Sequence, residues 1–155
     1  MPTVREEAEI DVRAPAAVAF GIVTGDLMQV NDDPEAVAGN RPIDAGPLRS
    51  GFRWQQTLAH ERRVCRTDWT ITNLHEARLL EQSFTHLCAV SGRVLDGGER
   101  WEFLQGEDGS TRVRLSAWRE RPGLDGWLER IFGSRGWSVS LRRRLNNIQF
   151  RAERA

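Results

Sequence analysis

Polar side chains that an antiparallel sheet would carry to its inner face are the residues of this chain best suited to chemistry. His86 comes first, since an imidazole takes up and releases a proton near pH 7. Gln82 lies four residues earlier on the same face of one predicted strand, about 13 Å from His86 along it. The other inward polar residues are Gln56, His60, Thr67 and either Glu6 or Glu99. Each must find a partner in the protein, in water or in a ligand.

Aromatic residues alternate onto the same faces as these polar groups. Such rings would form flat walls suited to a polycyclic or isoprenoid ligand. They would equally fill an ordinary hydrophobic core, so both readings stay open. The predicted wall residues are Trp54, Trp69, Phe84, Trp101 and Phe103.

Other kinds of site are not supported by the spacing. His60, His75 and His86 fall on different segments, and no H-x-H, C-x-x-C or H-E-x-x-H pattern occurs, so no metal site is expected. No glycine-rich phosphate loop is present, and no cofactor is expected. The chain has neither lysine nor tyrosine, which excludes a Schiff-base lysine and a tyrosine acid. Cys88 could pair with His86 only where the strand stays regular.

The first third of the chain predicts a strand, short helices and a loop-rich stretch. Apolar and polar residues alternate over 4–13, which indicates a strand with one buried face. Ala14-Pro15 ends it, and 15–24 predicts a short apolar helix. A second short helical turn is expected at 27–30, and an edge strand within 36–45.

A period of two continues from residue 50 to 119 and predicts an antiparallel meander. Asp96-Gly97-Gly98 and Asp108-Gly109 are typical of tight hairpin turns. Segment 87–95 allows two courses: an extension of the preceding strand through a bulge, or an extra short hairpin arm. The whole sheet should contain six to seven strands.

The remainder, after Pro122-Gly123, predicts an amphipathic helix. Gly133 and Gly136 separate two apolar stripes and predict a bend, which we hypothesise to be a hinge. The second stripe brings Leu141 and Leu145 toward the sheet. The stripes are Leu124, Trp127, Leu128, Ile131 and Phe132, then Trp137, Leu141, Leu145 and Ile148.

Charge is segregated although the chain is neutral overall. Residues 1–40 carry two Arg against eight acids, a net −6, and residues 112–155 carry eleven Arg against four acids, a net +7. We expect the two ends to lie side by side and neutralise each other, so nucleic-acid binding is not expected.

Composition favours one cytoplasmic domain over residues 1–155. Apolar residues make up 39% and charged residues 28% of the chain, and no apolar run is long enough to span a membrane. The N-terminal residues do not read as a secretory signal. Cys65 and Cys88 are therefore expected to be reduced thiols.

Several ordered local patterns make the chain resemble the SRPBCC superfamily, which includes START domains, the birch-pollen allergen and polyketide cyclase/dehydrase proteins. The resemblance covers nearly the whole chain and implies an α+β helix-grip fold: a curved antiparallel sheet around a long C-terminal α-helix, with two short helices after the first strand. The matching segments are Ala14-Pro15 with Ala17-Val18, Gly46-Pro47-Leu48 with Gly51-Phe52-Arg53-Trp54, Asp68-Trp69-Thr70-Ile71-Thr72, Arg78-Leu79-Leu80, and Trp101-Glu102-Phe103 with Gly109-Ser110-Thr111-Arg112-Val113-Arg114-Leu115.

The resemblance implies an apolar or aromatic small molecule bound in an internal cavity. We consider three functions: a polyketide cyclase/dehydratase-like enzyme in which His86 shuttles a proton, a non-catalytic lipid or quinone carrier, and a module that grips a protein partner. Family aromatases place Arg and Tyr in the cavity, and this chain has no Tyr. The oligomeric state, monomer or homodimer, stays open. The expected ligand contacts are Trp54, Gln56, Trp69, Gln82, Phe84, Trp101, Phe103, Leu141 and Leu145.

Overall fold

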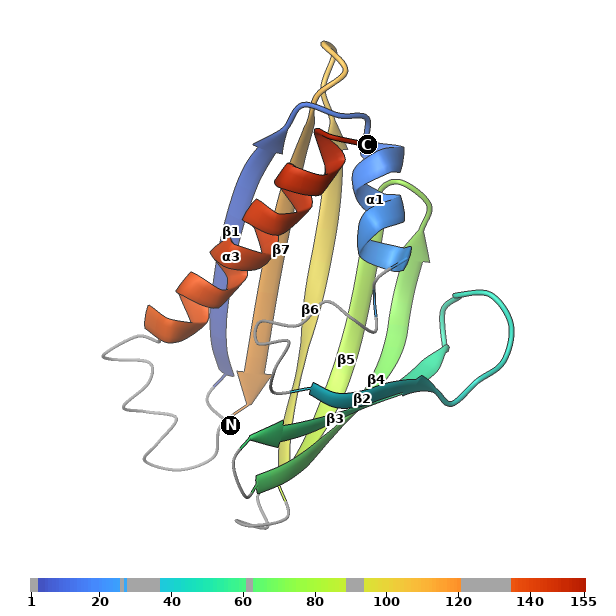
Figure 1. Cartoon of the computed structure of the whole chain (residues 1–155), viewed down its shortest axis with the longest axis vertical. Helices are drawn as coiled ribbons and strands as arrows, with labels where there is room; N and C mark the ends of the chain where they lie inside the picture. The colour runs from blue at the N-terminus through green and yellow to red at the C-terminus, as the bar shows by residue number, and fades with distance from the viewer. Residues whose placement is uncertain (1–2, 26, 28–36, 61–62, 89–93, 121–134) are drawn as a thin grey trace.

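A computed structural model of the chain describes residues 3–25, 27, 37–60, 63–88, 94–120 and 135–155. Its elements form one curved sheet with two helices (Figure 1). In chain order they are β1 (Thr3–Val12), α1 (Ala16–Gly25), β2 (Val37–Pro42), β3 (Arg53–His60), β4 (Arg63–His75), β5 (Leu79–Cys88), β6 (Val94–Gln105), β7 (Thr111–Glu120) and α3 (Arg135–Ala152).

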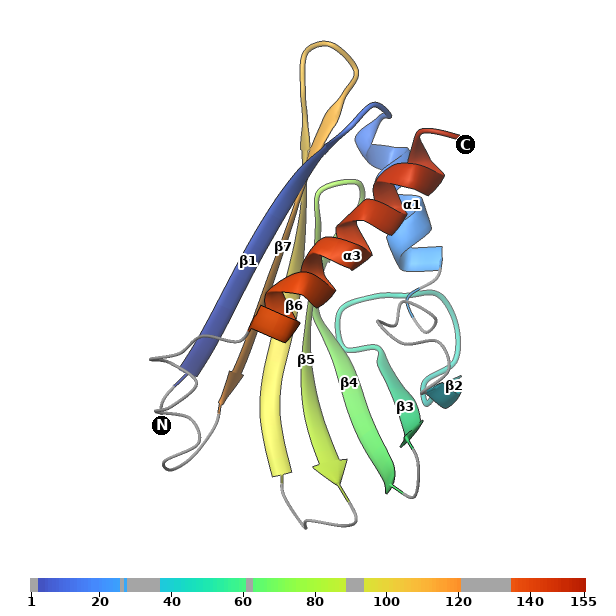
Figure 2. The same ribbon diagram turned by 60° about the vertical axis from the view of Figure 1, so that its left-hand side comes forward.

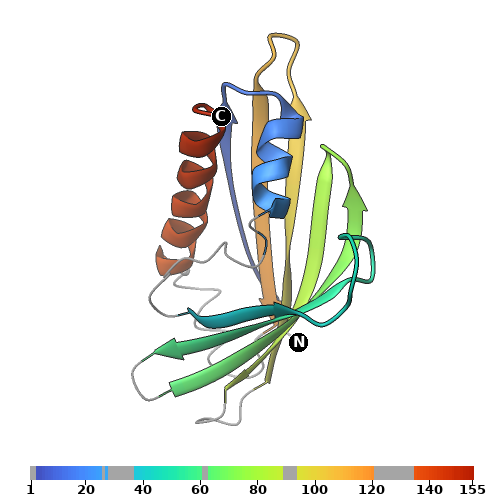
Figure 3. The ribbon, with the colours of Figure 1, turned by 45° about the vertical axis from the view of Figure 1, so that its right-hand side comes forward.

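All seven strands pair antiparallel in the order β1-β7-β6-β5-β4-β3-β2. Strands β2 to β7 form a meander, and β1 returns to the far side of β7. Figure 3 shows β2 and β3 swung strongly away from the direction of β7, as the twist of a large sheet requires. Helix α3 crosses the concave side near β1 and β7 (Figure 2). The helix-grip architecture predicted from the sequence is confirmed.

Alternation along the strands sorts side chains between the two faces of the sheet. The inner face buries Trp54, Ile71, Leu80, Trp101 and Leu115, each at most 2% exposed. Helix α3 adds a stripe at helical spacing, and the predicted second stripe is confirmed for these residues: Leu141, Leu145 and Ile148.

The outer face carries charged residues that pair across strands. Arg112 Nε lies 3.1 Å from Asp11 Oδ1, and Arg114 Nε lies 3.3 Å from Glu9 Oε2. These pairs join β1 to β7, so the acidic start of the chain lies against part of its basic end, as expected. Exposed pairs of this kind contribute at most about 1 kcal/mol each and mainly favour one register.

The first helix follows the sequence prediction closely. Helix α1 begins directly after Pro15, and its Ala16 N–H donates to Gln105 Oε1 at 2.7 Å. That bond satisfies one of the open N–H groups of its first turn. Ala19 and Val23 bury its inner side. The second helical turn predicted at 27–30 lies outside the described residues apart from Leu27, which is buried.

The prediction of a turn at Asp96-Gly97-Gly98 is wrong, because these residues lie inside β6 and pair with neighbouring strands. Their smallness serves close packing instead. A Cβ on Gly97 would lie 2.5 Å from the Phe84 ring, and a Cβ on Gly98 would lie 2.4 Å from the Trp118 ring. The turn at Asp108-Gly109 is confirmed, with Gly109 at a φ of +80°.

Of the two courses considered for 87–95, the described ends show β5 continuing in unbroken register to Cys88. Strand β6 begins at Val94, and residues 89–93 lie outside the described part. The edge strand expected within 36–45 is confirmed as β2. The first predicted stripe of the C-terminal helix and Gly133 also fall outside the described residues, so the hinge stays a hypothesis.

Candidate functional site

The site is built from three neighbouring rows of side chains on the inner face of β3, β4, β5 and β6. The middle row is aromatic, because the register makes Trp54 a partner of Trp69, and Trp69 a partner of Phe84. The two indole rings stack with centroids 5.3 Å apart and planes 4° apart. The Phe84 ring follows at 4.9 Å from Trp69, tilted by 56°, and leans across Gly97. The result is a continuous aromatic surface.

One neighbouring row is polar and contains the candidate catalytic residue. Gln56 pairs with Thr67, and Thr67 pairs with His86, on adjacent strands. Gln56 and Thr67 are buried, while the His86 ring is partly exposed. Thr67 Oγ1 and His86 Nδ1 share a hydrogen bond of 2.7 Å. This bond fixes the orientation of the ring relative to the aromatic row.

Burial sets the charge state of His86. Removal from water disfavours the imidazolium and lowers the pKa of His86 below its usual 6.5. The ring is therefore neutral at pH 7. A neutral imidazole has one N–H donor and one free lone pair, so it can accept a proton.

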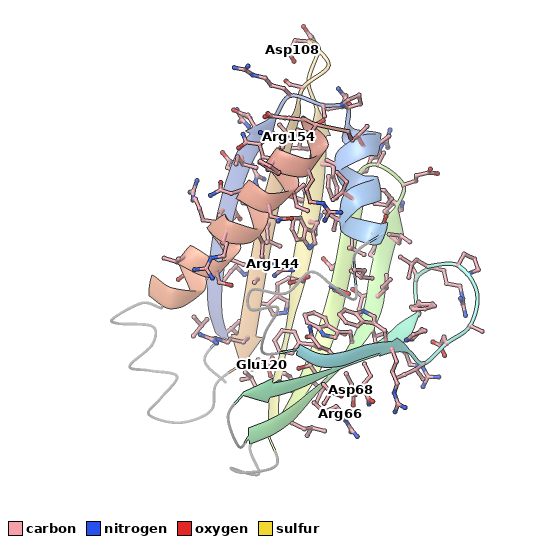
Figure 4. All side chains as sticks on the ribbon, in the orientation of Figure 1. Arg66, Asp68, Asp108, Glu120, Arg144 and Arg154 are labelled. Atoms are coloured by element: carbon pink, nitrogen blue, oxygen red, sulfur yellow. The ribbon has the colours of Figure 1, made fainter. Side chains whose placement is uncertain are left out.

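The row on the other side of the aromatic surface is a hydrogen-bonded network. Trp54 Nε1 donates to Gln82 Oε1 at 3.2 Å, and Gln82 Nε2 donates to Glu99 Oε1 at 2.8 Å. Arg144, which Figure 4 labels on α3, donates to both oxygens of Glu99, at 2.8 and 3.0 Å. Its guanidinium also lies over Trp101, 5.3 Å from the ring centre. The network ties α3 to β6, β5 and β3.

Glu99 is an anion in this network. Burial alone would raise the pKa of Glu99, but the charge of Arg144 and the hydrogen bonds from Arg144, Gln82 and Trp101 outweigh it and hold the pKa below its usual range. Glu99 thus remains ionised at neutral pH and is not suited to act as a proton donor there. Its part is to hold Gln82 and Arg144 in place.

The Trp69 indole adds a donor to the aromatic row. Trp69 Nε1 is buried, and no acceptor for it exists among the residues that the structure describes. A buried donor without a partner costs about 1–3 kcal/mol, so such groups usually bond to water or a ligand. An acceptor oxygen placed in line with this N–H, in the plane of the Trp69 ring, would satisfy it.

The structure brings together some of the predicted site residues and separates others. Trp54, Trp69, Phe84, Gln56 and His86 form two adjacent rows, and Gln82 starts the third. The other predicted contacts are fully or almost fully buried, as core residues are: Trp101 and Phe103 lie further along the sheet in β6, and Leu141 and Leu145 lie on α3. Phe103, for example, packs edge-on against Phe20 of α1, with ring centres 5.4 Å apart.

Two residues of the site were missed or undervalued from sequence. In the sequence, Arg144 is one of the eleven Arg of residues 112–155 with nothing to single it out, and Glu99 is one of two possible inward acids. An inward glutamate needs a cation beside it, and Arg144 directly precedes the buried Leu145. That pairing was the available signal.

Two solvent-facing grooves border α1, and their lining residues belong to none of these rows. One has a volume of about 470 Å³ and is lined by Phe20, Leu48, Arg49 and Leu74, among others. Another, of about 550 Å³, lies beside the turn that joins β4 to β5.

No cluster of three or more metal-ligating side chains occurs within the described ranges. No helix of the described part is long and apolar enough to cross a membrane.

Comparison with solved structures defines the class of fold. Ara h 8.0201 matches over 94% of this chain and 97% of its own, with a TM-score of 0.63 and 12% identity. The aromatase/cyclase Zhui from Streptomyces sp. R1128 matches over 98% of this chain and 94% of its own, with a TM-score of 0.64 and 14% identity. No protein-family model and no curated protein sequence matches the chain.

A third similar structure is the di-domain aromatase/cyclase StfQ from the steffimycin biosynthetic pathway. It matches over 96% of this chain and 44% of its own, with a TM-score of 0.57 and 20% identity. At these identities the likeness concerns the fold. The chain has the helix-grip fold of these three structures, which is the fold that the sequence resemblance implied.

Proposed function

We propose that this chain binds a flat apolar or aromatic small molecule on the inner face of its sheet. The observation that supports this proposal most directly is the continuous surface of Trp54, Trp69 and Phe84, with a row of polar side chains on each side. Trp69 and Phe84 are only partly buried by the described residues, so their rings have surface left to offer. A ligand packed against the parts of these rings that the neighbouring rings leave uncovered gains dispersion and apolar burial together.

The polar groups indicate which functions the ligand carries. Trp69 Nε1 is a donor in need of an oxygen, and Gln56, Thr67 and His86 lie in the adjacent row. We therefore propose an aromatic ligand with carbonyl or hydroxyl oxygens. The small-molecule partner and a cytoplasmic location belong to this proposal, together with a single-domain chain and no need of a cofactor.

A catalytic role is the second part of the proposal and depends on His86. A neutral imidazole beside a poly-β-ketone can take a proton from a carbon between two carbonyls. The resulting enolate carbon attacks a second carbonyl carbon of the same chain, and the new alkoxide recovers the proton from the imidazolium. Loss of water then leads toward an aromatic ring. The helix-grip neighbours Zhui and StfQ, both aromatase/cyclases, favour this reaction class.

Native mass spectrometry of freshly purified protein is the first test. We expect a bound small molecule that survives gentle ionisation and is released by denaturing extraction. A polycyclic aromatic favours the cyclase, and a long-chain lipid or quinone favours a carrier. Failure to find any ligand, followed by failure of a broad soak, would leave the protein-gripping module as the better account.

A matched pair of tryptophan variants locates the site. Trp69→Ala removes the central ring of the aromatic row, while Trp118→Ala removes a ring on the outer face that lies against Arg5. With 1-anilinonaphthalene-8-sulfonate as the fluorescent probe, we expect Kd to rise at least tenfold in Trp69→Ala and to stay within twofold in Trp118→Ala. Circular dichroism checks that both variants fold. Equal losses in the two variants would place the probe elsewhere.

The variant His86→Gln separates catalysis from binding. With a short synthetic poly-β-ketone thioester, whose spontaneous cyclisation sets the background, we expect wild type to change the rate or the product pattern. His86→Gln should bind the probe as wild type does and return the product pattern to background. If the wild-type protein leaves both the rate and the product pattern at background, we would replace the proposed enzyme with a non-catalytic carrier.

A further inference from the structure

The fold places the two cysteines of the chain directly opposite each other. The sequence contains Cys65 and Cys88 and no third cysteine. Cys65 lies near the start of β4, and Cys88 is the last residue of β5. In the antiparallel register of these strands they are Cα partners. The sequence does not reveal this relation, because the turn after β4 and the irregularity between Ile71 and Asn73 together determine which residues face each other.

The register makes the pairing firm. Cys65 is followed by the partner pairs Thr67–His86 and Trp69–Phe84, with no shift in register up to Ile71. Positions two apart on a strand share a face, so Cys65 and Cys88 occupy inner-face positions next to Thr67 and His86. The single irregularity of this ladder falls between Ile71 and Asn73, toward the turn.

Backbone spacing in such a pair suits a disulfide. Directly opposed residues in antiparallel strands have Cα atoms about 4.5 or 5.5 Å apart, depending on their hydrogen-bonding position. Disulfides form with Cα atoms roughly 4.4–6.8 Å apart. Both antiparallel spacings fall in that range, so a bond between the two positions needs little backbone movement.

We propose that Cys65 and Cys88 form a reversible intrachain disulfide that ties β4 to β5 when the chain meets a disulfide oxidant such as oxidised glutathione. One thiolate attacks the glutathione disulfide, forms a mixed disulfide and releases one glutathione thiol. The second protein thiolate then displaces the other glutathione. One S–S bond forms in the protein as one breaks in the oxidant, and two electrons and two protons pass to two glutathione thiols.

The position of the bond defines its effect. The β4–β5 hairpin is already closed at one end by its turn, where Arg78 N–H donates to the His75 carbonyl at 3.0 Å. Cys65 and Cys88 lie at the other end of the pairing, so the bond would close the hairpin into a ring. A ring of this length restricts the unfolded chain and leaves the folded one little changed. This modification site does not depend on the proposed ligand.

Thiol counting on the full chain tests the proposal. The protein is reduced with dithiothreitol, desalted, equilibrated with set ratios of oxidised and reduced glutathione, alkylated with iodoacetamide and weighed intact. We expect two alkylated thiols in the reduced protein and none in the oxidised protein, with loss of two hydrogens and no glutathione adduct. The oxidised form should unfold at a Tm higher by about 5–10 °C. Dithiothreitol should restore both thiols.

Single variants supply the controls. Cys65→Ser and Cys88→Ser each leave one thiol with no neighbour to displace glutathione, so each should accumulate a stable glutathione adduct. The double variant should not respond to the oxidant. The proposal fails if wild type accumulates adducts on both cysteines, if the two thiols are lost independently, or if non-reducing electrophoresis shows disulfide-linked dimers instead. The wild-type mass result decides the matter even if a variant fails to fold.

Discussion

The buried charge of Glu99 on the inner face lies directly against the opposite charge of Arg144. Glu99 and Arg144 have side chains only 6% and 12% exposed, and both guanidinium ends bind the carboxylate. A buried ion pair contributes little compared with a well-packed apolar pair, yet breaking it is costly because one charge stays behind. The pair therefore specifies where α3 rests on β6 more than it adds to stability.

Removing one partner of this pair should destabilise the fold strongly. Glu99→Gln leaves Arg144 charged beside a neutral amide, and we expect the free energy of unfolding to fall by about 3–5 kcal/mol. Urea denaturation measures this loss. The double variant Glu99→Leu/Arg144→Met removes both charges and should be clearly more stable than Glu99→Gln. A loss below about 1 kcal/mol in Glu99→Gln would contradict the described network.

His86 should make stability depend on pH in a defined window. Its pKa in the folded chain lies below 6.5, so between that folded pKa and 6.5 the unfolded chain binds more protons than the folded one. The stabilisation is complete above 6.5 and is lost as the pH falls toward the folded pKa. We expect the free energy of unfolding to decrease through this window in wild type.

The variant His86→Gln isolates that effect. It should flatten the pH dependence in this window and leave the loss that begins below about 4.5, where Glu99 of the unfolded chain takes up a proton while its pKa in the folded chain is lower. Proton NMR titration gives the direct check, because the signal absent from the variant belongs to His86. A midpoint at or above 6.5 for that signal would show that the ring is not desolvated.

Much of the candidate site follows from alternation in the sequence. Trp54, Gln56, Trp69, Gln82 and Phe84 were assigned to the inner face by period two alone, and the structure describes all of them there. Which of them touch was not predictable, because contact depends on the register between strands. Arg144 was missed for a similar reason: the phase of α3 against the sheet is set by contacts that no local pattern contains.

At the scale of a strand, glycine inside β6 is required by packing. Gly97→Ala would place a Cβ 2.3 Å from the Trp118 carbonyl oxygen as well as against Phe84. We expect this variant to lose about 1–3 kcal/mol of unfolding free energy through overpacking. The matched control is Gly21→Ala in α1, which meets nothing within 4 Å and should gain about 0.5–1 kcal/mol.

Chemical denaturation of both variants measures the difference. If Gly97→Ala proves as stable as Gly21→Ala, Phe84 does not lean across β6 as described. The comparison also explains the wrong turn prediction: a D-G-G sequence marks a turn locally, whereas here Phe84 and Trp118 from neighbouring strands require the small residues. Local sequence holds no information about those two rings.

At the scale of the molecule, the sequence predicted the order of elements and the curl, but not every pairing. Strand β1 could have joined either edge of the meander. It joins β7, where Asp11 and Glu9 meet Arg112 and Arg114. The opposite charges of the two chain ends were visible in the sequence and indicated this pairing, although they could not specify its register.

Ligand binding should be visible in the stability of the whole molecule. A ligand at one hundred times its Kd stabilises the folded state by about 2.7 kcal/mol if it binds only that state. For a chain of 155 residues this corresponds to a rise in Tm of roughly 5–11 °C. Because the proposed contacts come from β3, β4 and β5, hydrogen exchange should slow most in those strands and less in β1.

The molecule supplies its own controls for this measurement. At the same ligand concentration, Trp69→Ala should lose the rise in Tm, while Trp118→Ala should keep it. If the ligand slows hydrogen exchange only in β1 and β7, the ligand binds at the other side of the sheet or on its outer face. Protection of α3 together with β3 to β5 would instead show that ligand occupancy is coupled to the Glu99–Arg144 pair. That outcome follows if the aromatic row and the network joined to it through Trp54 and Gln82 act as one unit.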